Sequence, residues 1–75
     1  MNLSLVIPVY NEQDNLPNLF DALYATLNTI QKSWEVILVD DGSRDKSLEV
    51  LKEYAQKDPE HIRVISFRRN FGQTA

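Results

Sequence analysis

Three short apolar runs are spaced along the chain. They occupy residues 3–9 (LSLVIPV), 34–39 (WEVILV) and 62–67 (IRVISF). Apolar runs of this length, rich in valine and isoleucine and bounded by polar segments, are typical of β-strands. The pattern therefore predicts three strands at these positions.

The segment between the first two runs has the spacing of an amphipathic helix. Its apolar residues recur every three or four positions, at Leu16, Leu19, Phe20, Leu23, Leu27 and Ile30. This spacing predicts a helix over roughly residues 15–31, with Asp14 or Asn15 accepting from its first amides and Pro17 in its first turn.

A shorter helix is predicted between the second and third runs. Its apolar side consists of Leu48, Val50, Leu51, Tyr54 and Ala55. We expect Ser43 or Asp45 to cap its start and Pro59 to end it.

The predicted order of elements is β-α-β-α-β, which implies a parallel sheet. Right-handed crossovers arrange its strands in the order 3-2-1 and place both helices on one face. Residues 5–7 and 36–39 are apolar at consecutive positions, as in strands covered on both faces, but the sequence supplies no cover for the second face. Residues 70–75 are typical of a loop that leads into another helix. We therefore expect residues 1–75 to be the N-terminal, incomplete part of one α/β domain.

The composition and charge of the chain exclude several kinds of partner and site. The hydrophobic fraction of 43% and the charged fraction of 25% are ordinary for a soluble globular protein. The net charge is −3 and the basic residues are scattered except for Arg68 and Arg69, so a nucleic-acid partner is not expected. The absence of cysteine excludes disulfides and thiolate metal sites, and we expect neither a signal peptide nor a membrane anchor in this segment.

We expect ligand-binding residues in the loops that follow the strands, because open α/β sheets bind ligands outside the carboxyl ends of their strands. These ends lead into residues 8–13, 40–43 and 68–73. A dinucleotide-binding half would place G-x-G-x-x-G directly after the first strand, where this chain has P-V-Y-N-E. The interpretation as a nicotinamide-cofactor site thereby loses its main support.

Tyr10, with the polar residues Asn11 and Glu12 beside it in the first of these loops, has the chemistry of a nucleoside site. An aromatic ring can stack on a nucleobase for roughly 1–3 kcal/mol, and a carboxylate can accept a hydrogen bond from a ribose hydroxyl. Alternatively, Tyr10 packs under the helix and Asn11 caps it. The residue types support both interpretations equally.

The second loop, D-D-G-S at 40–43, places two carboxylates at the end of the central strand. Because adjacent strand positions point to opposite faces, one aspartate is expected to face a ligand while the other braces the turn. The first role would let a carboxylate accept from the N–H edge of uracil or guanine. The same residues are common in turns and caps, and residue types alone favour that interpretation.

The third loop contains Arg68 and Arg69, which could neutralise a diphosphate, although a solvated pair is the commoner explanation. Asn70 and Gly72 could turn backbone amides toward an anion. His61 has no second ligand at metal spacing, so we assign it no function.

Three segments together resemble the family 2 glycosyltransferases of GT-A fold: S-L-V-I-P-V-Y-N-E at 4–12, V-D-D-G-S at 39–43 and F-R-R-N-F-G-Q at 67–73. The third is most similar to the branch that loads a sugar onto a polyprenyl phosphate, as dolichyl- and undecaprenyl-phosphate glycosyltransferases do. The resemblance implies that the chain is a Rossmann-like half of a GT-A nucleotide-sugar-binding domain.

Site residues follow from the resemblance. It implies that Pro8, Tyr10 and Glu12 line the base and ribose pocket and that Asp41, with Asp40 beside it, meets the base edge. The segment near the donor phosphates would contain Asn70, Gly72 and Gln73. The D-x-D motif that holds a divalent metal (Mg²⁺ or Mn²⁺) and the catalytic carboxylate are expected after residue 75, so no catalytic residue or metal ligand is assigned within the chain.

For the full-length protein the resemblance implies an enzyme that transfers a sugar, with inversion, from a UDP-sugar or GDP-mannose to a polyprenyl phosphate. The 75-residue segment would be inactive alone. A place at the cytoplasmic face of the membrane, with attachment through regions outside this segment, is also implied, and oligomerisation stays open. Two alternatives remain: a Rossmann-like module for a nicotinamide cofactor or another nucleotide, and a non-catalytic chain that folds only by pairing its uncovered sheet face.

Overall fold

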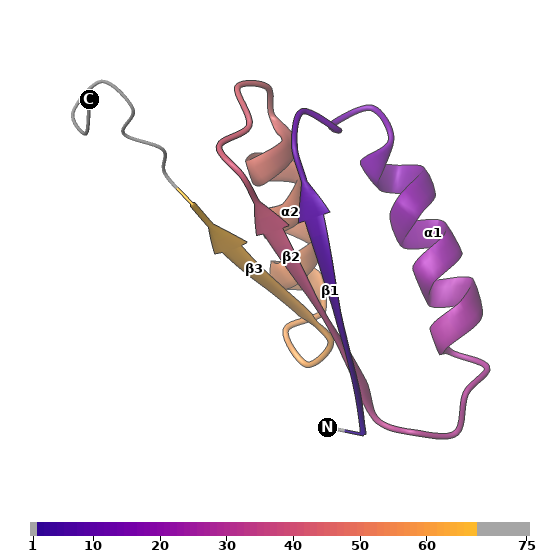
Figure 1. Ribbon diagram of the computed structural model, residues 1–75. Helices are drawn as coiled ribbons and strands as arrows, with labels where there is room; N and C mark the ends of the chain where they lie inside the picture. Colours follow the sequence, from indigo (N-terminus) through magenta and orange to yellow (C-terminus); the bar gives the residue numbers. More distant parts are fainter. Residues whose placement is uncertain (1, 68–75) are drawn as a thin grey trace.

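The computed structural model describes residues 2–67. Its elements are β1 (Leu3–Val9), α1 (Leu16–Leu27), β2 (Trp34–Asp40), α2 (Ser47–Lys57) and β3 (Ile62–Ser66). The three strands are parallel and lie in the order β1-β2-β3 (Figure 1). This is the predicted order 3-2-1 read from the opposite edge, so the Rossmann-like β-α-β-α-β arrangement is confirmed.

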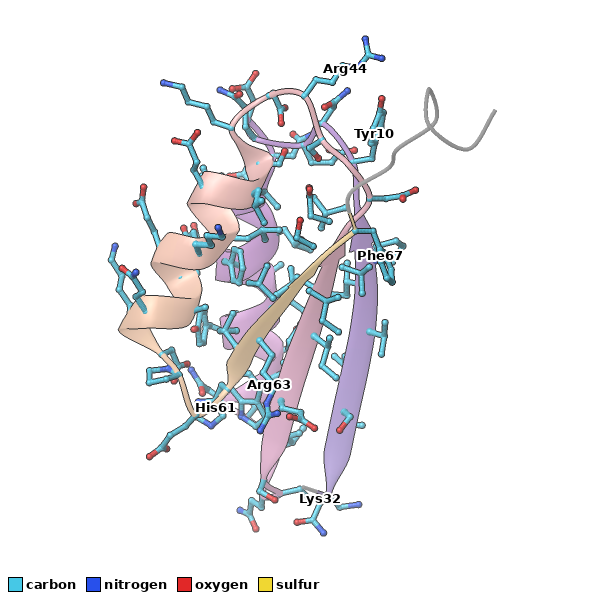
Figure 2. The ribbon with its side chains drawn as sticks, turned by 90° about the vertical axis from the view of Figure 1, so that its left-hand side faces the viewer. Tyr10, Lys32, Arg44, His61, Arg63 and Phe67 are labelled. Carbon is cyan, nitrogen blue, oxygen red and sulfur yellow. The ribbon has the colours of Figure 1, made fainter. Side chains whose placement is uncertain are left out.

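One face of the sheet is buried beneath both helices. Every second residue of β2, from Trp34 to Asp40, is buried, and Figure 2 shows α1 and α2 on the same side of the strands. The apolar core between sheet and helices consists of Val9, Leu16, Phe20, Leu27, Trp34, Val36, Leu38, Leu51 and Ile62. The prediction that both helices cover one face is therefore confirmed.

The opposite face, which we call the open face, has no cover among residues 2–67. Val6, Ile65 and Phe67 on this face are 65%, 46% and 56% exposed. Toward the amino ends of the strands the face is polar, because Glu35 accepts from the Ser4 hydroxyl at 2.7 Å and pairs with Arg63 Nε at 3.1 Å. The apolar part of the open face thus lies nearer the carboxyl ends.

α1 is shorter than predicted, since it ends at Leu27. Beyond that point the amides of Thr29 and Ile30 bond to carbonyls only three residues back, those of Thr26 and Leu27, each at 3.3 Å. The Thr29 hydroxyl also donates to the Thr26 carbonyl at 2.6 Å. Threonine competes in this way for helix carbonyls, so Ile30 packs against the core from a turn rather than from the helix.

The predicted helix caps are wrong in part. Asn15 has helical dihedrals (φ −94°, ψ −14°), whereas a residue that caps a helix through its side chain is usually extended. The side-chain amide of Asn15 instead donates from Nδ2 to Glu12 Oε2 at 2.9 Å. At the start of α2, Asp45 Oδ1 accepts from the Ser47 amide at 2.9 Å. Ser43 does not cap α2, because its hydroxyl accepts a hydrogen bond from the Asn11 amide in the loop that follows β1.

Candidate functional site at the strand ends

The carboxyl ends of β1 and β2 lie side by side. Val9 pairs with Asp40 in the parallel register, and the Asp41 amide donates to the Val9 carbonyl at 2.9 Å. The pairing therefore continues one step past the strands. Tyr10 and Asp41, which follow the paired residues Val9 and Asp40, are therefore neighbours across the two strand ends.

Three predicted site residues, Pro8, Tyr10 and Asp41, lie at or just beyond the carboxyl ends of β1 and β2. Pro8 lies on the open face by strand alternation, and Tyr10 and Asp41 directly follow the last residues of the two strands. Pro8 is exposed and Tyr10 is 51% exposed; Figure 2 shows Tyr10 at the same end of the sheet as Phe67. We call Pro8, Tyr10 and Asp41 the strand-end rim.

Asp40 lies on the other side of the sheet and is only 2% exposed. Its Oδ2 accepts from the Ser43 amide at 3.2 Å, and its carbonyl accepts from the Phe67 amide at 2.9 Å. Among the described residues, Asp40 Oδ1 has no hydrogen-bond partner. Gly42 completes the turn with φ 75°, a value that glycine adopts without steric cost. Asp40 therefore braces the turn, the role expected for one of the two aspartates, and the structure does not bring it to the rim.

Glu12 is exposed, and one of its oxygens is directed to the start of α1, where it accepts from Asn15. A pocket of about 240 Å³ beside β1 is lined by Pro8, Val9, Glu12, Asn15, Leu16 and Leu19. Neither Tyr10 nor Asp41 lines this pocket. Glu12 thus borders the rim through its neighbour Pro8, with part of its carboxylate engaged by α1.

The predicted phosphate-binding residues Asn70, Gly72 and Gln73 lie outside the described residues, as do Arg68 and Arg69. Within residues 2–67 no three histidine, aspartate or glutamate side chains are grouped so as to hold a metal ion. Neither described helix is long and apolar enough to cross a bilayer.

Hydrogen bonds interlock the loop after β1 with the loop after β2, a feature that the sequence analysis missed. In one direction, three consecutive backbone amides of residues 11–13 donate to side chains of residues 43–47. The pairs are Asn11 to Ser43 Oγ at 2.8 Å, Glu12 to Ser47 Oγ at 2.8 Å and Gln13 to Asp45 Oδ2 at 3.3 Å.

Backbone amides of the second loop donate in return to side chains of the first. Asn11 Oδ1 accepts from Arg44 at 2.8 Å and from Asp45 at 3.4 Å, and Gln13 Oε1 accepts from Lys46 at 2.8 Å. We call residues 11–13 and 43–47, joined in this way, the loop clamp. The only signal for it in the sequence was that both segments are polar, and this does not say which residues pair.

Asp45 contributes a carboxylate to the hydrogen bonds of the loop clamp. The buried Ser47 hydroxyl donates to Asp45 Oδ1 at 2.6 Å and is the main reason that the pKa of this carboxyl lies below its ordinary value of 3.8. The Ser47 and Gln13 amides lower this pKa further. Because the folded pKa is lowered, the carboxylate stabilises the fold above pH 3.8, and this contribution is lost as the pH falls further.

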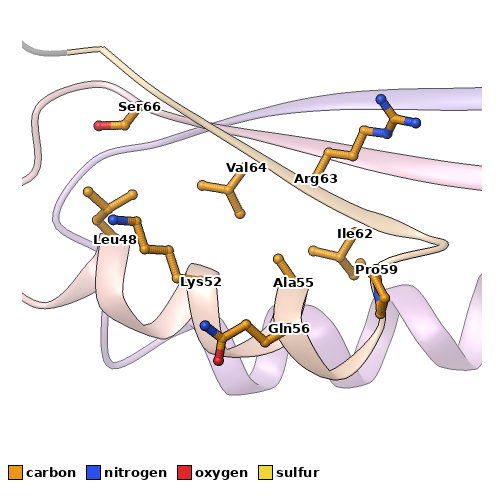
Figure 3. A pocket seen from close by; sticks show the side chains of 9 residues that line it. All are labelled: Leu48, Lys52, Ala55, Gln56, Pro59, Ile62, Arg63, Val64 and Ser66. Atoms are coloured by element: carbon orange, nitrogen blue, oxygen red, sulfur yellow. The ribbon is translucent and has the colours of Figure 1, made fainter.

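A larger hollow of about 510 Å³ lies between α2 and β3 (Figure 3). It is lined by Leu48, Lys52, Ala55, Gln56, Pro59, Ile62, Arg63, Val64 and Ser66. None of the predicted site residues lines it. The candidate site is therefore the strand-end rim.

Comparison with known proteins connects this geometry to a family. Residues 4–75 match glycosyl transferase family 2. Similar relatives named undecaprenyl-phosphate 4-deoxy-4-formamido-L-arabinose transferase come from Pectobacterium atrosepticum (50% identity over 72 residues), Pectobacterium carotovorum subsp. carotovorum (50% over 72) and Edwardsiella ictaluri (45% over 71).

These alignments cover 96%, 96% and 95% of this chain but 22% of each relative, so the chain spans about a fifth of the length of the relatives it matches. The family match includes all three strand ends that the sequence analysis singled out. The chain belongs to glycosyl transferase family 2.

Proposed function

We propose that this chain supplies the nucleoside-binding part of a glycosyltransferase that uses a nucleotide-sugar donor. The observation that carries the proposal is the strand-end rim, in which the half-exposed Tyr10 ring and Asp41 follow neighbouring, hydrogen-bonded strands. Neighbouring strands lie about 4.8 Å apart, so one base could stack on Tyr10 and present its edge to Asp41. The Asp41 carboxylate would accept from the N–H of uracil or guanine.

The donor phosphates would extend from this nucleoside toward Asn70, Gly72 and Gln73, which the family resemblance assigns to that region. Glu12 would serve the ribose with the part of its carboxylate that Asn15 leaves available. Asp40 would not contact the nucleoside; its carboxylate would hold the turn that contains Asp41 by accepting from the Ser43 amide.

For the full-length protein we propose transfer of the sugar, with inversion, to a polyprenyl phosphate. The names of the relatives support this acceptor, since they specify undecaprenyl phosphate, and they specify 4-deoxy-4-formamido-L-arabinose as the sugar. The same proposal includes a location at the cytoplasmic face of the membrane, with attachment through regions outside this segment. The 75-residue segment by itself would bind a nucleotide without transferring sugar.

A divalent metal, Mg²⁺ or Mn²⁺, would ease the departure of the nucleoside diphosphate when bound. Residues 2–67 contain no cluster of acidic or histidine side chains that fits such an ion. We propose that its ligands, and the catalytic base, lie after residue 75, as the family resemblance implies.

Calorimetric titration of the full-length protein with UDP and with GDP tests the proposal. We expect one of the two to bind, and the Asp41→Ala substitution to weaken it about tenfold or more because a charged hydrogen bond is lost. Asp21→Ala, which removes an exposed carboxylate from α1, is the matched control and should leave affinity unchanged. Equal affinity of wild type and Asp41→Ala would refute the assigned role.

The nicotinamide-cofactor alternative rests on the acidic residues after β2, which could also hold a ribose. A parallel titration with NAD separates the two interpretations. Tight NAD binding, with no response to UDP or GDP, would replace the proposed function.

A further inference from the structure

We infer that Asn11 is a positioning residue, which sets the placement of Tyr10 relative to Asp41 by tying the loop after β1 to the loop after β2. The inference rests on the proposed function, because it concerns how the nucleoside site is held in shape. Asn11 directly follows Tyr10 in the chain, and its partner Ser43 lies two residues after Asp41.

Asn11 is bound to the second loop through both its backbone and its side chain. Its amide donates to Ser43 Oγ at 2.8 Å, and its Oδ1 accepts from the Arg44 and Asp45 amides at 2.8 and 3.4 Å. These are three of the six hydrogen bonds that form the loop clamp. No other residue of the first loop makes as many.

The backbone of Asn11 explains why this residue can reach the second loop. Its φ of 51° lies in the left-handed region, where asparagine, aspartate and glycine are tolerated far better than other residues. The chain turns sharply at this point. The same residue therefore supplies the turn after Tyr10 and the acceptor that fastens the turn to Arg44 and Asp45.

This arrangement affects ligand binding more than folding. Tyr10 is half exposed, so the placement of its ring depends on the backbone that follows it. A loop held in place before the ligand arrives has less conformational freedom to lose on binding, and affinity is higher for that reason. The three remaining bonds, made by Glu12 and Gln13, keep the loops together when Asn11 is changed.

Two substitutions separate the roles of the residue. Asn11→Gly keeps the left-handed backbone and removes the side-chain acceptor. Asn11→Asp keeps both an acceptor oxygen and tolerance of the positive φ. Asn18→Asp adds the same charge at an exposed position of α1 that, within residues 2–67, makes no hydrogen bond with Glu12, and so corrects for the charge itself.

Tyr24→Phe is the control for stability. It removes the hydrogen bond from the Tyr24 hydroxyl to Asp58 Oδ2 (2.8 Å), far from the rim, and should lower the melting temperature without touching the loops. All variants are made in the full-length protein. Affinities for UDP and GDP and melting temperatures are measured for each.

We expect Asn11→Gly to bind the nucleotide about tenfold or more weakly than wild type, and the affinity of Asn11→Asp to stay within about threefold of that of Asn18→Asp. Tyr24→Phe should keep wild-type affinity in spite of its lower melting temperature. Three results would overturn the inference while the wild type still binds. They are an unchanged affinity of Asn11→Gly, an affinity of Asn11→Asp as low as that of Asn11→Gly, and a loss of affinity in Tyr24→Phe as large as that in Asn11→Gly. Failure of wild type to bind either nucleotide would instead refute the proposed function and this inference with it.

Discussion

A polar and aromatic cluster lies at the end of the sheet opposite the strand-end rim. It consists of Tyr24, Asp58, His61 and Trp34. Asp58 accepts from the Tyr24 hydroxyl and lies 3.1 Å from His61 Nδ1, and the His61 ring stacks on Trp34 with ring centres 3.9 Å apart. His61, to which the sequence analysis gave no function, is thus a packing residue in this structure. Figure 2 shows it far from Tyr10.

Tyr24 makes stability depend on pH in the alkaline range. Burial, and next the hydrogen bond to Asp58, raise the pKa of Tyr24 from 10.0 to about 12. A raised folded pKa means that the stabilising contribution is complete below pH 10 and is lost as the pH rises toward 12. We expect the free energy of unfolding, measured by urea denaturation between these pH values, to fall more steeply for wild type than for Tyr24→Phe. Parallel curves would contradict this assignment.

At the scale of elements, α1 and α2 are joined by an aromatic contact. Phe20 is fully buried, and its ring stacks on Tyr54 with centres 3.8 Å apart and planes at 9°. The spacing of apolar residues predicted that both side chains lie on the inner faces of their helices. It contained no information on which ring of one helix meets which ring of the other.

Replacing Phe20 by leucine tests this contact. The substitution keeps an apolar side chain but removes the ring stacking and leaves some space unfilled, so we expect a loss of about 1–2 kcal/mol in the free energy of unfolding. Urea denaturation followed by tryptophan fluorescence would report it through Trp34. Asn18→Ala, at an exposed position of the same helix, should change stability by less than about 0.5 kcal/mol. Similar losses in the two variants would argue against the contact.

At the scale of the whole molecule, the sheet is covered on one face only in residues 2–67. Val6 on β1, Ile65 on β3 and Phe67 just beyond β3 expose apolar surface on the two outer strands of the sheet. Contiguous apolar patches on a protein surface are typical of places where further structure or another molecule packs.

The isolated 75-residue chain is therefore expected to self-associate through its open face. In sedimentation velocity, the average mass should rise with concentration, and the double substitution Val6→Ser, Ile65→Thr should reduce that rise because it removes exposed apolar surface. Ala22→Ser with Ala25→Ser, at exposed positions of α1, is the matched control. A wild-type chain that stays monomeric at every concentration would contradict the expectation.

Local patterns in the sequence determined the elements and their order. The first apolar run predicted β1 with the observed bounds, Leu3–Val9, because a run of this length and composition suits a strand whatever surrounds it. Alternation likewise predicted that Asp40 and Asp41 have different roles, since neighbouring strand residues point to opposite faces. Right-handed crossovers then left one strand order.

Only the tertiary structure decided the partner of Ser43 and the loop clamp. Ser43 bonds to Asn11, 32 positions away, instead of capping α2. The end of α1 at Leu27 has a local reason, the bond from the Thr29 hydroxyl to the Thr26 carbonyl, which the spacing of apolar residues does not predict. Short polar side chains have several partners within reach, and the choice depends on which chain segments the sheet brings together. Apolar periodicity records burial, which is a property of each segment, whereas hydrogen-bond partners between distant segments exist only once the strands have paired.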